Sequence, residues 1–176
     1  MITASGCRTM ARYNAWQNES LYGAAGTLDE AARRAQRGAF FGSIHATLSH
    51  LVWADRMWLS RFGRGEAPGG GIAGSVALFA DWPSLRAARQ AMDAEILDWA
   101  DALSEADLEG DLSWFSGATG REMVRPRALC VLHLFNHQTH HRGQVHAMLT
   151  AAGAVPGPTD LAFAPPGVTG AECEGG

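Results

Sequence analysis

Apolar residues recur at spacings of three and four along four stretches of this chain, as on the buried face of an amphipathic helix. The pattern is strongest over residues 43–62, which contain neither glycine nor proline. The apolar band there consists of Ile44, Leu48, Leu51, Val52, Trp58, Leu59 and Phe62. The same periodicity predicts helices over residues 8–25, 81–103 and 127–152.

The ends of these stretches carry the signals that start and stop helices. Asp81 supplies an N-cap side chain and Pro83 follows it in the first turn. Gly153 and the prolines at 156 and 158 end the last helix. Residues 29–37 predict a short helical turn, whereas residues 63–74 are rich in glycine and predict a loop.

The stretch between residues 112 and 124 leaves two interpretations open, a small hairpin or an irregular loop. In either case the four helices predict an all-α fold, a four-helix bundle, as a single domain over residues 1–176 with a short irregular C-terminal tail. Bundles of this kind build ligand sites from side chains on facing helices.

Composition agrees with a packed globular protein and excludes several functions. Apolar residues make up 47% of the 176 residues and charged residues 18%. The net charge is -4 and no dense basic run is present, so nucleic-acid binding is disfavoured. All 14 basic residues are arginine, which excludes Schiff-base chemistry, lysine-anchored pyridoxal phosphate and the phosphate-loop lysine.

The cysteine pattern and the search for targeting or membrane segments predict the redox state and the location of the protein. The three cysteines, Cys7, Cys130 and Cys173, are odd in number and irregularly spaced, and therefore do not predict a disulfide framework. We find neither a signal-peptide pattern nor an apolar run of about 18 residues. The sequence therefore predicts a cytoplasmic protein without a membrane partner.

Histidines are concentrated in the last predicted helix. Five of the seven lie between His133 and His146, and His137 is four residues from both His133 and His141. Residues four apart share a helix face, so two imidazoles can bind one ion. Imidazole nitrogen suits zinc, nickel, copper or ferrous iron better than magnesium or calcium. A third ligand must come from another helix.

His45 and His50 are the candidates for that third ligand, and His50 is favoured because Trp53, Ala54 and Met57 share its face. A buried imidazole needs a partner, and a metal ion can be that partner. The alternative is that each histidine is an ordinary hydrogen-bonded core or surface residue.

Four other features have an ordinary structural interpretation that carries more weight than a functional one. Gly69, Gly71 and Gly74 match the G-x-G-x-x-G string of dinucleotide sites, but no predicted strand precedes them. Arg56 and Arg142 can bind an anionic cofactor, although helical arginines are more often solvated or paired with acids. The tryptophans are mostly core, with Trp53 a possible wall of the metal pocket, and Cys130 is expected to be buried packing.

Several motifs together resemble the DinB/YfiT-like superfamily of bacterial metal-binding four-helix bundles. They are YNAWQN from Tyr13, HATLSHLVWADRMWLSRF from His45, LFNHQTHHRGQVHAML from Leu134, and PGPTDLAF near the C-terminus. The resemblance implies an up-up-down-down bundle, a homodimer, and a divalent metal held by His50, His137 and His141. It leaves His140 out of the ligand set, and it gives Asn136, Gln144 and Asp160 supporting or structural roles.

The superfamily is similar in fold and site to thiol-dependent enzymes such as mycothiol-dependent maleylpyruvate isomerase and bacillithiol S-transferases. The resemblance therefore implies a metal-dependent transferase, with zinc or nickel favoured and iron as an alternative, that activates a low-molecular-weight thiol for attack on a small-molecule electrophile. The competing hypothesis is a metal-binding stress-response protein without turnover. Fold alone does not separate the two.

Overall fold

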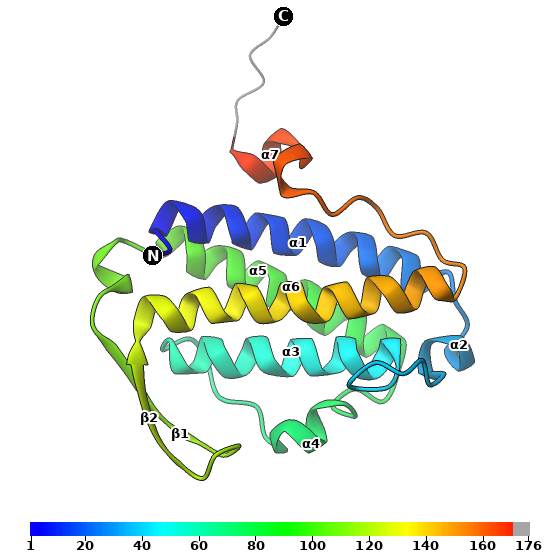
Figure 1. Cartoon of the computed structure of the whole chain (residues 1–176), viewed down its shortest axis with the longest axis horizontal. Helices are drawn as coiled ribbons and strands as arrows, with labels where there is room; N and C mark the ends of the chain where they lie inside the picture. Colours follow the sequence, from blue (N-terminus) through cyan, green and yellow to red (C-terminus); the bar gives the residue numbers. More distant parts are fainter. Residues whose placement is uncertain (171–176) are drawn as a thin grey trace, which may run out of the picture.

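Four long helices form the body of the computed structural model, which describes residues 1–170 (Figure 1). They are α1 (Ala4–Gly26), α3 (Ile44–Arg61), α5 (Trp82–Ala102) and α6 (Arg127–Ala151). The predicted all-α four-helix bundle is thereby confirmed. The end of the predicted tail, with Cys173, lies outside the described residues.

Side-chain caps explain where three of these helices begin. Ser43 Oγ accepts from the Ala46 amide before α3 at 3.1 Å, and Asp81 Oδ1 accepts from the Ser84 amide before α5 at 2.8 Å. Thr3 caps α1 in the same way, which is why that helix starts four residues before the predicted residue 8. The Asp81 cap was predicted from the sequence.

The helix directions correct one expectation. The colours of Figure 1 show α1 and α6 running one way and α3 and α5 the other, an up-down-down-up order instead of up-up-down-down. Contacts agree, because Asp55 of α3 meets Arg89 of α5, and Phe62, directly after α3, meets Trp99 further along α5. The cause is the segment between α3 and α5, which runs back along the bundle so that both helices start at the same end (Figure 1).

Short elements occupy the connections. A helix α2 (Glu30–Arg34) follows α1, and residues 112–124 belong to the hairpin of β1 (Asp111–Ser116) and β2 (Arg121–Pro126), the first of the two interpretations of this stretch. The 3-10 helix η1 (Ala106–Leu108) precedes the hairpin.

Two segments predicted to be irregular contain short helices, which is a correction. The glycine-rich segment ends in α4 (Gly71–Ser75), and the tail contains η2 (Leu161–Phe163) and α7 (Pro166–Thr169). Tertiary contacts stabilise these turns, since α4 packs on α3 and α7 packs on α1. Their own sequences are too short and too rich in glycine and proline to predict a helix.

A buried polar layer divides the core between two apolar clusters. Arg89 Nη1 lies 2.6 Å from Asp55 Oδ2, and Arg89 Nη2 lies 2.9 Å from Asp93 Oδ1. Arg142 donates to Asn14, whose amide in turn donates to Asp93. Buried charged and polar groups need ion-pair or hydrogen-bond partners, so this layer fixes the register of all four helices.

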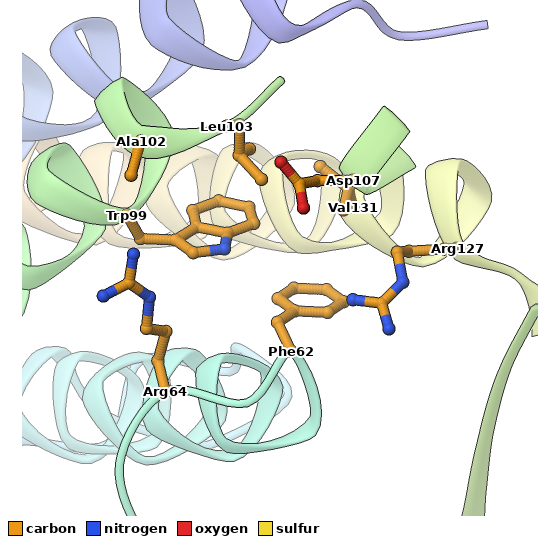
Figure 2. Close-up of a pocket in the computed structure, with 8 residues that line it drawn as sticks. All are labelled: Phe62, Arg64, Trp99, Ala102, Leu103, Asp107, Arg127 and Val131. Atoms are coloured by element: carbon orange, nitrogen blue, oxygen red, sulfur yellow. The ribbon is translucent and has the colours of Figure 1, made fainter. Parts of the chain in front are cut away.

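The end of the bundle where α3 ends and α6 begins contains a small cavity of about 120 Å³ (Figure 2). Its floor is the stacked pair of Phe62 and Trp99, whose ring centroids are 5.3 Å apart. Figure 2 shows Arg64 and Arg127 on either side of this pair, and no histidine lines the cavity. Among residues 1–170, no helix has the length and apolar character needed to cross a bilayer.

Candidate metal centre

Three histidine rings converge between α3 and α6. One ligating nitrogen from each of His50, His137 and His141 lies within 4.8 Å of the other two. The Nε2 atoms of His50 and His137 are 3.3 Å apart, and the ring centroids of His137 and His141 are separated by 4.5 Å. The structure thus brings together the three residues that the sequence singled out.

Helix geometry explains the convergence. His137 and His141 are one turn apart on α6 and project from the face that packs against α3. His50 lies on the facing side of α3 and is 4% exposed. Because the ligands come from rigid helices, their positions do not depend on a loop closing.

Hydrogen bonds orient two of the three rings. His50 Nδ1 lies 2.8 Å from Ser75 Oγ, which donates its own proton to the Ile72 carbonyl at 2.6 Å. Ser75 Oγ therefore accepts from His50 Nδ1–H, and the lone pair of His50 is on Nε2. His141 Nδ1 lies 2.8 Å from Gln144 Oε1, an acceptor, so its lone pair is on Nε2 as well.

Burial keeps the three imidazoles neutral. Desolvation, with a smaller contribution from His141, lowers the pKa of His50 to about 4. Desolvation and the neighbouring histidines lower the pKa of His137 to about 3, and desolvation also lowers the pKa of His141. Neutral imidazole is the form that binds a metal ion.

The donor set fits a divalent ion with an affinity for nitrogen. Three neutral imidazoles suit zinc, nickel or ferrous iron and leave further coordination positions open. His137 Nδ1 is buried and has no hydrogen-bond partner, so this ring lacks the Nδ1 hydrogen bond that orients His50 and His141. The three histidines can therefore hold a metal ion.

Aromatic rings surround the centre. The Phe41 ring centroid lies 3.9 Å from that of His50 and 5.3 Å from that of His141. The ring centroid of Trp53 lies 6.0 Å from that of His50, and the indole N–H of Trp53 donates to the Gly69 carbonyl at 2.8 Å. Trp53 therefore walls the site, as the sequence allowed, and also ties the glycine-rich segment to α3.

Sequence reasoning missed Phe41 and Ser75. Both belong to connections between helices, and their distance from the ligands in the sequence gives no signal. The one local hint for Phe41 is its place next to Gly42, because tight turns favour glycine, and Gly42 does adopt a positive φ of 81° before α3.

The remaining histidines lie outside the ligand group. His45 is fully buried, with its Nε2 3.0 Å from the Phe79 carbonyl, and secures the segment before α5. His140 is exposed and approaches Gln144. His133 is exposed, although its ring centroid lies 5.8 Å from that of His137.

The supporting residues named from the sequence divide into two groups. Gln144 contacts His141 directly, whereas Asn136 and Asp160 are exposed and form no side-chain hydrogen bond with the three histidines. Arg142 is buried in the polar core and donates to Asn14, while Arg56 is exposed on α3. Arg142 is therefore part of the packed core.

Comparisons with known proteins show the family and the fold of this chain. The model of the DinB family matches residues 1–167. The protein named DinB of Bacillus subtilis strain 168 is 24% identical over 161 residues, which cover 84% of this chain and 87% of that protein. A crystal structure of a DinB-like protein from Bacillus cereus ATCC 10987 is similar in fold, with a TM-score of 0.59 and 20% identity. That similarity covers 81% of this chain and 90% of the other.

Proposed function

This chain belongs to the DinB family, and from that premise we propose that it binds one divalent metal ion through His50, His137 and His141 and uses it to transfer a low-molecular-weight thiol to a small electrophile. The observation that carries the proposal is the convergence of three neutral imidazoles, two of which are oriented by hydrogen bonds. In a purely structural cluster, nothing would require the Nε2 lone pairs of His50 and His141 to point at the same place.

Activation of a thiol requires little more than a metal ion held by these three histidines. A bound divalent ion supplies a positive charge that lowers the pKa of a thiol and favours the thiolate at neutral pH. Ser75 and Gln144 hold the Nδ1–H groups of His50 and His141, which keeps their Nε2 lone pairs directed at one point. Phe41 and Trp53 limit the access of water, and the nearby charges therefore interact more strongly.

Metal binding is tested with single alanine variants. We expect His137→Ala and His141→Ala to lose stoichiometric zinc or nickel in elemental analysis, with an unchanged helical circular-dichroism spectrum. The matched control is His140→Ala, which removes an exposed histidine from the same helix and should retain the metal. Full metal content in the first two variants would refute the ligand assignment.

Turnover needs a separate assay. Metal-loaded protein is offered glutathione, mycothiol or bacillithiol together with model electrophiles, and conjugates are detected by mass spectrometry. Conjugates that disappear in His137→Ala support the transferase. Metal binding without any conjugate would favour the stress-response binding protein instead.

The family resemblance also supports a homodimer in the cytoplasm, which we include in the proposal. Light scattering after gel filtration measures the mass of the particle against the 18.7 kDa of one chain. A monomer at all concentrations would contradict this part alone.

A further inference from the structure

A second cavity, of about 320 Å³, lies between the hairpin and the bundle. Trp114, Met123 and Arg125 line it from the hairpin, and Trp58, Cys130 and His133 from α3 and α6. Its volume falls within the range of small-molecule pockets, roughly 300–1,000 Å³. None of the three metal ligands lines it.

We propose that this cavity binds a flat aromatic ring that carries an anionic substituent. This binding does not depend on the proposed function.

The shape of the cavity favours a flat ring. The indoles of Trp58 and Trp114 meet with centroids 5.6 Å apart and an angle of 68°, so they form a corner. An aromatic ring in this corner can stack on one indole while its edge meets the face of the other. Arg61 lies over both rings, at 4.5 Å and 5.2 Å from their centroids, and holds the angle between them.

The hairpin register directs the right residues inward. Trp114 pairs with Met123 across the two strands, and both line the cavity. The next residue, Phe115, points to the other face of the hairpin and is 63% exposed. The hairpin thus presents the face with Trp114, Met123 and Arg125 to α6 and supplies the outer wall of the cavity.

Charge favours an anionic substituent. Arg125 lines the cavity and forms no ion pair with any acid among residues 1–170. One of its nitrogens donates to the Val124 carbonyl, and the rest of the guanidinium is available for a carboxylate. Among residues 1–170, no acidic side chain lines the cavity to repel an anion.

The cavity adjoins the metal centre through one side chain. His133 lines the cavity, and its ring lies between Trp58 and the ligand His137, with centroid distances of 4.9 Å and 5.8 Å. Trp58 lies eight residues from the ligand His50 on α3, so a ring held against Trp58 is about two helical turns from the proposed ion. Cys130 forms an apolar wall, because burial raises the pKa of its thiol and keeps it protonated.

Binding is tested with 2-naphthoate by isothermal titration calorimetry. Metal-free protein is used because a carboxylate can also bind an ion directly. We expect one saturable site per chain, with 2-naphthylmethanol and cyclohexanecarboxylate each about tenfold weaker, since each lacks one of the two recognised features. Absence of saturable binding would overturn the proposal.

Paired variants locate the site. Trp114→Ala and Arg125→Gln should each weaken 2-naphthoate binding about tenfold. Their controls are Phe115→Ala, on the exposed face of the same hairpin, and Arg121→Gln, on the same strand but outside the cavity. Equal losses in variant and control would place the ligand elsewhere.

A measurement on the unchanged protein guards against a disrupted hairpin in Trp114→Ala. In ¹⁵N-labelled protein, 2-naphthoate should shift the indole N–H signals of Trp58 and Trp114, two of the six in the chain. Shifts confined to other tryptophans would contradict the proposal. Loss of metal from His137→Ala leaves this result unchanged, so failures of the two proposals remain distinguishable.

Discussion

Replacing Ser75 by alanine should weaken metal binding about 10- to 100-fold, although Ser75 is not a ligand. Its hydroxyl accepts from His50 Nδ1 at 2.8 Å and donates to the Ile72 carbonyl at 2.6 Å. Without this acceptor, the imidazole proton of His50 can move to Nε2, the atom that must bind the ion. The predicted loss corresponds to roughly 1.4–2.8 kcal/mol of binding free energy.

The same substitution should lower the unfolding free energy of the metal-free protein. Ser75 is fully buried and His50 is 4% exposed, so the freed N–H cannot be satisfied by bulk water. An unsatisfied buried donor costs about 1–3 kcal/mol. Urea unfolding followed by circular dichroism measures this cost.

Ser49→Ala is the matched control. Ser49 is also fully buried, and its hydroxyl donates to the Ser75 carbonyl at 2.6 Å, but it forms no hydrogen bond with a histidine. This variant should lose similar stability and keep its metal affinity, measured by competition with a chromogenic chelator. If Ser75→Ala binds zinc within about threefold of the unchanged protein, orientation of His50 does not set the affinity.

Two further predictions concern the core and pH. Arg89→Met leaves the Asp55 carboxylate buried without its partner and should lower the unfolding free energy, measured by urea titration, by about 3–5 kcal/mol. A loss below about 1 kcal/mol would show that the buried polar layer contributes little to stability. In the folded, metal-free chain burial lowers the pKa of His50 to about 4 and that of His137 to about 3, from the ordinary 6.5. Between these folded values and 6.5, the unfolded chain therefore binds more protons than the folded chain. Stability, measured as Tm, should therefore fall as pH decreases from about 6.5 towards 4, and less steeply in His137→Ala; equal slopes would contradict burial as the cause.

The sequence predicted those parts of the fold that depend on local periodicity. The apolar band of residues 43–62 and the Asp81 cap placed α3 and α5 within one residue of their bounds. Helix direction does not follow from periodicity. It depends on whether the connection between α3 and α5 turns at once or runs back along the bundle, and contacts such as that of Asp55 with Arg89 decide this.

The division between helices and connections also determines which part of the site could be predicted. His137 and His141 share a face because of the helix period, and His50 was found because apolar residues share its face. Ser75 and Phe41 reach the same centre through connections whose paths depend on packing, so no spacing in the sequence marks them. The arrangement has a functional consequence: the ligands are fixed by rigid helices, while the orientation of His50 and the access of water depend on the segments that connect the helices. Substitutions in those segments can therefore tune metal affinity and substrate entry without dismantling the ligand set.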